Sequence, residues 1–130
     1  VIDYGTLNVT DISGEQSVQI KNTGNANINV SVDGYGQLDG DGAAMNCSGG
    51  TSIALSYERY AVFSNANFSI NMTQLTDTAL PNGITNLTIV ETDDDNQNST
   101  NLTYWRIQVP LGVDAGPCNG TIIFSAVSFE

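Results

Sequence analysis

INVSV, residues Ile28–Val32, is the stretch of sequence from which the fold can be argued. It alternates apolar and polar side chains, and successive side chains of a β-strand point to opposite faces. Ile28, Val30 and Val32 are therefore expected on an inner face. Asn29 and Ser31 are expected on the outer face. The period of two predicts a strand with one buried side.

The same alternation occurs in NFSINMT, residues 67–73. Phe68, Ile70 and Met72 would occupy the inner face of a strand, with the polar residues between them facing outward. This segment is accordingly predicted to be a second strand of the same kind.

Alternating runs continue along the chain, and no window shows an apolar stripe at helical spacing. Turns rich in Gly and Asn separate the runs at roughly ten-residue intervals. The expected strands are Tyr4–Thr10, Ser17–Asn22, Asn27–Asp33, Thr51–Leu55, Arg59–Phe63, Asn67–Thr73, Leu87–Glu91, Leu102–Val109 and Thr121–Phe129. They predict an all-β fold, a single antiparallel β-sandwich of Ig-like or jelly-roll-like type over residues 1–130. The expected inward residues are Val18, Ile20, Ile28, Val30, Val32, Leu87, Ile89, Trp105, Ile107, Val109, Ile122 and Phe124.

The charge balance excludes several classes of partner. Three Lys and Arg residues face fourteen Asp and Glu residues, for a net charge of -11. Nucleic acid and anionic membranes are disfavoured, because both are bound through basic side chains. The chain also has no histidine, which removes the usual general base and the commonest zinc ligand.

Two cysteines, Cys47 and Cys118, lie in the turn-like sequences MNCSGG and GPCNG. An even count suggests a disulfide if the protein is outside the cell, and buried thiols if it is not. A bridge would close a long loop and stabilise the fold by about 4 kcal/mol in the chain-entropy model.

N-glycosylation acceptor triplets are more frequent than this composition gives by chance. Nine asparagines match Asn-x-Ser/Thr: Asn8, Asn29, Asn46, Asn67, Asn71, Asn86, Asn98, Asn101 and Asn119. Most of the triplets carry an apolar or small middle residue, so a strand would place the acceptor on its outer face. We therefore expect an extracellular, cell-surface glycoprotein. The chain opens at Val1, as a processed mature chain would, and no run approaches a transmembrane helix.

No catalytic arrangement emerges, and the protein is not expected to be an enzyme. The acidic clusters Asp93–Asp95 and Asp39–Asp41 lack EF-hand spacing, and they are expected to be solvated turns, with calcium binding the weaker alternative. We expect no cofactor apart from covalent N-glycans, and no metal site. Exposed Tyr57, Tyr60 and Tyr104 could form a carbohydrate platform, although core packing is the commoner role of such aromatics.

The two ends of the chain carry strand-like sequence, which leaves sheet edges to be covered. One solution is to donate a terminal strand to a neighbouring copy. Residues 1–10 are the candidate donor strand, with Leu7 and Val9 as its packing residues, residues 11–15 a turn or joint, and residues 16–130 the body.

The segments KNTGNANINVSV and YWRIQVPLGVDAGPCNGTIIFSA resemble small β-sandwich modules of secreted archaeal surface proteins. The second matches their W-x-x-x-VP-x-GV-x-AG ending from Trp105 through Gly116 and continues to Ala126. Such modules are similar to the subunits of archaeal extracellular threads and bundling pili, and more distantly to TasA/camelysin-type biofilm fibres. The resemblance implies filament assembly by donor-strand exchange and heavy N-glycosylation. The cysteine pair is not part of that pattern.

Two hypotheses follow. The first is a structural subunit that forms a homopolymer, with no nucleic-acid partner and no membrane insertion of the mature chain. The alternative is a monomeric module of a cell-surface or S-layer protein that binds carbohydrate or calcium.

Overall fold

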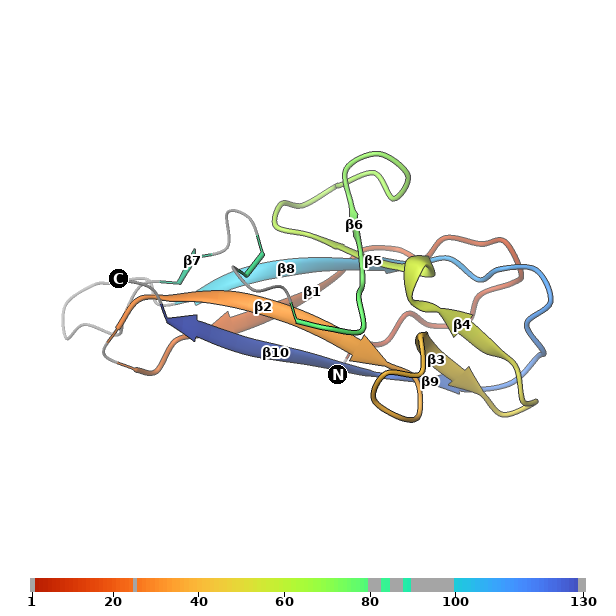
Figure 1. The fold of residues 1–130 in the computed structure, drawn as a ribbon. Helices are drawn as coiled ribbons and strands as arrows, with labels where there is room; N and C mark the ends of the chain where they lie inside the picture. The colour runs from red at the N-terminus through yellow and green to blue at the C-terminus, as the bar shows by residue number, and fades with distance from the viewer. Residues whose placement is uncertain (1, 25, 80–82, 85–87, 90–99, 129–130) are drawn as a thin grey trace.

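The computed structural model describes the chain except for residues 1, 25, 80–82, 85–87, 90–99 and 129–130. Regular structure in the described residues is nearly all β, and every pair of neighbouring strands is antiparallel. The predicted all-β, sandwich-like class is confirmed (Figure 1).

Three small sheets make up the body. The first has the order β1 (Gln16–Lys21), β8 (Thr100–Ile107), β5 (Glu58–Ala61), β6 (Thr73–Gln74). The second has the order β10 (Thr121–Ser128), β2 (Ile28–Tyr35), β7 (Thr88–Ile89). The third has the order β4 (Ser52–Ala54), β3 (Ala43–Cys47), β9 (Cys118–Asn119), and the 3-10 turn η1 (Leu55–Tyr57) joins β4 to β5.

The core lies between the first two sheets, centred on Trp105 of β8, which is fully buried. Its ring lies 5.2 Å from the ring of Tyr60 on β5 and 6.0 Å from the ring of Phe124 on β10. Its indole Nε1 donates a hydrogen bond of 2.8 Å to Oγ1 of Thr103, so the buried polar atom is satisfied within the same strand. Aromatic contacts thus join the two sheets across the sandwich.

Six expected strands are confirmed to within about two residues: β1, β2, β4, β5, β8 and β10. In β2, Val30 and Val32 are buried as predicted. Ser31, expected on the outer face, is also fully buried. β2 is flanked on one side by β10 and on the other by Thr76 and Ile84, which hydrogen-bond to Gly34 and Val30, so a small side chain between them has little access to water.

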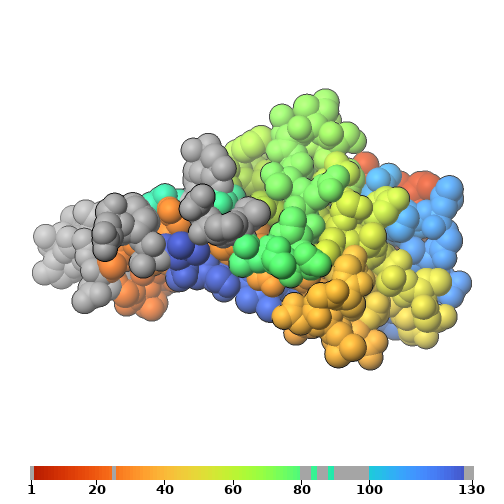
Figure 2. Space-filling model, viewed as in Figure 1, coloured from red at the N-terminus to blue at the C-terminus, as the bar shows by residue number. Residues whose placement is uncertain are grey.

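The prediction of a strand over residues 67–73 is wrong except at its last residue. The backbone N–H of Asn71 donates to the carbonyl of Asn67 at 2.9 Å, and the N–H of Ser69 donates to Oδ1 of Asn67. This side chain therefore closes a turn in competition with sheet pairing. Phe68 and Met72 are buried in a satellite cluster with two alanines, while Ile70 is 77% exposed. Figure 2 shows the green segment between β5 and β6 projecting from the body.

Two short strands, β3 and β9, were not predicted. AAMNC in β3 has no alternation, and β9 is only two residues long. β9 packs closely against β3, because a Cβ at Gly120 would overlap the carbonyl oxygen of Ala44. Only glycine fits at this point of contact.

The expected strand Tyr4–Thr10 is not a strand either. Residues 2–9 have no regular secondary structure, with Gly5 at a φ of 75° and Val9 in a turn, and we call them the arm. Within the described residues, no strand of the body pairs with this segment. Of the expected Leu87–Glu91 strand, Thr88–Ile89 forms β7 and the remaining residues lie outside the described part of the chain.

Candidate functional site

The candidate site is the seam between β1 and β10, the strands at the open edges of the two main sheets. Among the described residues, each is hydrogen-bonded to a single neighbouring strand, β1 to β8 and β10 to β2. Val18 of β1 and Ile122 and Phe124 of β10 turn toward the core, yet all three are only partly buried. The prediction that these side chains face inward is right, but the seam leaves them incompletely covered.

A hollow of about 400 Å³ lies at this seam. Its walls come from β1, β3, β5, β9 and β10, and two arm residues, Ile2 and Tyr4, are part of its lining. A second and larger groove, of about 860 Å³, continues along the arm toward the loop of residues 113–119. The two hollows follow the arm, and their lining mixes apolar side chains with polar ones, among them the Glu58 side chain.

The arm packs against these hollows by side chains alone. Ile2 and Tyr4 pack on the main core cluster, and Leu7 packs on the cluster of Cys47, Ile53 and Ile107. Within the described part of the chain, no backbone hydrogen bond joins residues 2–9 to a strand. The arm therefore occupies the seam without completing either sheet.

The two predicted packing residues of the arm fare differently. Leu7 is partly buried, whereas Val9 is 39% exposed and only borders the larger groove. The inward residues Ile2 and Tyr4 were missed as packing residues. Alternation could have placed Ile2 and Tyr4 on one face, because they lie two residues apart. Leu7 joins them on the inner side because the chain changes direction at Gly5, which has a φ of 75°.

A buried carboxyl is the polar centre of the site. Glu58 on β5 is 2% exposed, and Tyr4 Oη donates a hydrogen bond of 2.6 Å to its Oε2. Burial raises the pKa of Glu58 to about 7, and the Tyr4 hydroxyl offsets part of this rise. Burial, with a smaller contribution from the neighbouring carboxylate, also raises the pKa of Tyr4. This pair joins positions 54 residues apart, so no local sequence motif announces it.

The arm is tied to the body just after it ends. Thr10 N donates to the carbonyl of Val109 at 2.7 Å, and Ser13 N donates to that of Ile107 at 2.8 Å. Ser13 is buried, and its Oγ accepts a hydrogen bond from Ile107 N. Thr10 has φ of 74°, an unusual backbone conformation for a residue with a side chain. The segment predicted as a joint, residues 11–15, is thus anchored to the end of β8 at Asp11–Ser13 and forms a fixed pivot.

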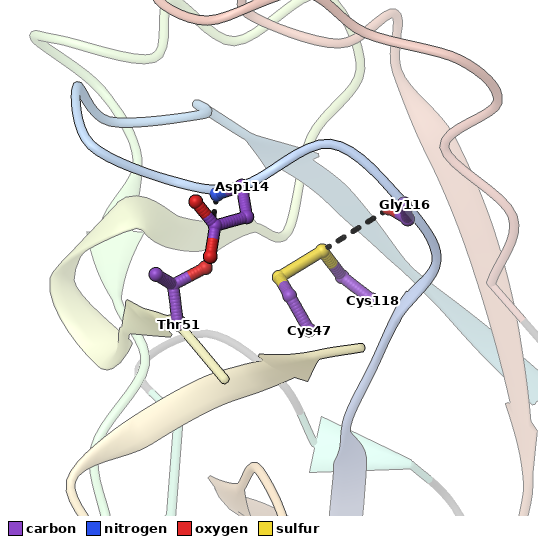
Figure 3. Close-up of a disulfide and its surroundings, with 5 residues drawn as sticks. All are labelled: Cys47, Thr51, Asp114, Gly116 and Cys118. Atoms are coloured by element: carbon purple, nitrogen blue, oxygen red, sulfur yellow. Dashed lines mark hydrogen bonds between the residues drawn. A yellow bond between two sulfur atoms is a disulfide. The ribbon is translucent and has the colours of Figure 1, made fainter. Parts of the chain in front are cut away.

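The disulfide prediction is confirmed. Cys47 and Cys118 are bridged, with an S–S distance of 2.04 Å, and they lie directly opposite each other in β3 and β9. Figure 3 shows the bridge beside the 113–118 loop, where Asp114 N donates to Thr51 Oγ1 at 3.0 Å. Cys118 Sγ lies 3.7 Å from the carbonyl oxygen of Gly116. The bridge thus fixes the loop that forms one wall of the larger groove.

The glycosylation acceptors lie away from the core. Asn8, Asn67, Asn71 and Asn119 are exposed; Asn29, Asn46 and Asn101 are half-buried; Asn86 and Asn98 lie outside the described residues. Asn46 and Asn119 are direct partners across β3 and β9, so glycans on both would compete for space. Their modification stays a prediction.

The acidic loop after β2 is held by one aspartate. The Asp41 carboxylate accepts hydrogen bonds from the backbone N–H groups of Gly36, Gln37, Leu38 and Ala43. These bonds hold the pKa of Asp41 well below its usual range. In the described residues no three His, Cys, Asp or Glu side chains are grouped as metal ligands. The Asp93–Asp95 cluster lies outside those residues.

The proposed tyrosine platform is not assembled. Tyr60 is 2% exposed and belongs to the core, while Tyr57 and Tyr104 are partly buried. Arg59 lies over the Phe68 ring at 4.3 Å and holds the β5–β6 segment, and Arg106 donates to the Ser13 carbonyl beside the pivot. Both arginines therefore stabilise local structure.

Among the described residues, no helix has the length and apolar character needed to cross a membrane. No family model matches the sequence, and searches of curated proteins and of solved structures gave no match. The functional argument therefore depends on the seam, the arm and the bridge.

Proposed function

We propose that this protein is the structural subunit of an N-glycosylated extracellular filament, in which the arm of each copy completes the seam of the next. The observation that carries the proposal is the arm itself. It packs apolar side chains into the seam between the edge strands β1 and β10, and among the described residues it makes no backbone hydrogen bond to either strand.

The chemistry of the seam favours an extended segment as its occupant. The outer edges of β1 and β10 present unpaired backbone N–H and C=O groups, and an added strand would satisfy them. An eight-residue strand is about 26 Å long, so residues 2–9 have the length to pair along all of β10, which is also eight residues.

The arm of a second copy is the occupant we infer. The same residues already lie against this seam within one chain, and Ile2, Tyr4 and Leu7 meet apolar walls there. The contacts therefore fit this sequence whichever chain supplies it, which is the general basis of domain swapping. The pivot at Asp11–Ser13 holds the base of the arm while residues 2–9 swing to a neighbour.

Compartment and surface are consistent with this role. A disulfide accords with an oxidising, extracellular environment. Glycans on exposed asparagines such as Asn67 and Asn71 would keep filaments apart, because bulky sugars block lateral pairing of sheet edges.

The direct test is removal of the arm. A chain lacking residues 1–9 keeps the pivot, and it should give no fibres in negative-stain micrographs under conditions in which the full chain polymerises. The matched control exchanges exposed arm residues, Asp3→Asn with Thr6→Ser, and should polymerise normally. Fibres of the shortened chain, or discrete particles of the full chain under every condition, would rule out arm donation and favour a monomeric surface module.

A further inference from the structure

The Glu58 carboxyl is placed to contact any strand that fills the seam. It lies on β5 opposite Ile107 and lines the hollow beside the arm residues Ile2 and Tyr4. Among the described residues, Tyr4 supplies its side-chain hydrogen bond. A buried carboxyl without a donor is costly, so an occupant that offers none is disfavoured.

The arm offers a single suitable donor on its inner side. The other inward residues, Ile2 and Leu7, are aliphatic. A shift of the arm by one residue would bring Asp3 or Gly5 opposite Glu58, giving a second carboxylate or no side chain. A shift by two would bring Ile2, which cannot donate, or Thr6, whose hydroxyl is several bonds shorter than that of tyrosine.

We propose that Glu58 determines which strand the seam accepts and in which register, by requiring a tyrosine hydroxyl opposite its carboxyl. This inference rests on the proposed strand donation and identifies its specificity-determining pair, Glu58 in the acceptor and Tyr4 in the donor. The partner it selects is the extended N-terminal segment of a second copy of this chain. Apolar strands of similar hydrophobicity are rejected because they leave the carboxyl unpaired.

Labelled peptides test the pair on the full-length chain. The acceptor carries Ile2→Ser, Tyr4→Ser and Leu7→Ser, which remove the inward contacts of its own arm, including its own hydrogen bond to Glu58. Two fluorescent peptides, VIDYGTLNV and its Tyr4→Phe form, are titrated against it, and binding is followed by anisotropy. A scrambled peptide of the same composition is the control. The tyrosine peptide should bind about tenfold more tightly, as expected for one hydrogen bond to a buried carboxyl.

An acceptor change completes the test. Glu58→Met keeps the side-chain length and removes both acceptor oxygens, so the two peptides should then bind equally. Equal binding to the Glu58 acceptor would overturn the specificity role and leave strand donation intact. If neither peptide binds a folded acceptor, strand donation fails, and the specificity role fails with it. If the acceptor does not fold, the changes Tyr4→Phe and Glu58→Met are made singly and together in the full chain, and the free energy of unfolding in urea is measured for each. Additive losses of stability would overturn the pairing of the two side chains.

Discussion

Strands β8 and β10 are both eight residues long and both face the core, yet they are buried to very different degrees. In β8, Thr103, Trp105 and Ile107 are almost inaccessible, whereas Ile122 and Phe124 of β10 are only partly buried. In the part of the chain that the structure describes, β8 has a hydrogen-bonded neighbouring strand on each side, and β10 has one. Burial here is therefore set by the number of neighbouring strands as well as by the side chains.

The comparison also separates two ways of handling buried polar groups. The Trp105 indole of β8 donates to Thr103 in the same strand, so its hydrogen bond does not depend on which segment occupies the seam. The Glu58 carboxyl depends on Tyr4 of the arm. The closed region of the core is thus self-sufficient, and the open region depends on its occupant.

Breaking the closed region should have the largest effect. Trp105→Ala is expected to lower the free energy of unfolding by about 3–5 kcal/mol, because it opens a cavity and removes two aromatic contacts. Urea unfolding followed by circular dichroism measures this. Leu111→Ala is the control, since that side chain is 81% exposed and its loss should cost less than about 0.5 kcal/mol. A loss of under about 1 kcal/mol for Trp105→Ala would mean that the core is not organised around this ring.

The buried Glu58 carboxyl at the seam should make the free energy of unfolding depend on pH. The pKa of Glu58 is about 7 in the folded chain and near 4.5 in the unfolded one, so the folded chain retains a proton that the unfolded chain releases. The free energy of unfolding should therefore fall as the pH rises from about 4.5 to about 7, by on the order of 3 kcal/mol. Chemical unfolding at a series of pH values measures this slope.

Glu58→Gln is the matched variant for this slope. It should flatten the dependence in the same window, where the absence of histidine leaves few other groups to titrate. Burial also raises the pKa of Asp33, and this contribution remains in both chains, so the difference between them isolates Glu58. Equal slopes would show that the carboxyl is not buried in solution.

A core substitution in the edge strand β10 should change the free energy of unfolding least of the three. Phe124→Ala is expected to lower the free energy of unfolding of the unassembled chain by about 1 kcal/mol, because a half-covered ring gains only part of the transfer free energy of a buried one. The same urea titration used for Trp105→Ala gives the direct comparison. A loss as large as that of Trp105→Ala would mean that the seam is already closed in the free chain.

The strands that were predicted correctly are those whose apolar–polar alternation coincides with a position between neighbouring strands of a sheet. β2 and β8 have neighbours on both sides, and Val30, Val32, Trp105 and Ile107 are buried on the inner face as the period of two indicates. Residues 67–73 have the same period but begin with an asparagine whose side chain bonds the backbone of Ser69, and this local bond prevails where no strand is available to pair.

The candidate site was predicted in part. The involvement of the N-terminal segment follows from strand-like sequence at the end of the chain, and its donation to another copy stays a proposal. The Tyr4–Glu58 pair does not follow from the sequence in this way, because it joins distant residues through the tertiary fold. One signal was present: in YERY, Glu58 lies two residues before Tyr60, so a core position for Tyr60 places the carboxyl on the same inner face.

The disulfide has a mechanical consequence. A pull on the arm passes through the pivot into the end of β8 at Ile107 and Val109. β8 lies inside the covalent loop closed by Cys47 and Cys118, which contains β4 to β8 as well as the pivot's partners. Under tension that loop cannot be drawn out to its full contour length, so in the filament proposed above β4 to β8 would resist extension.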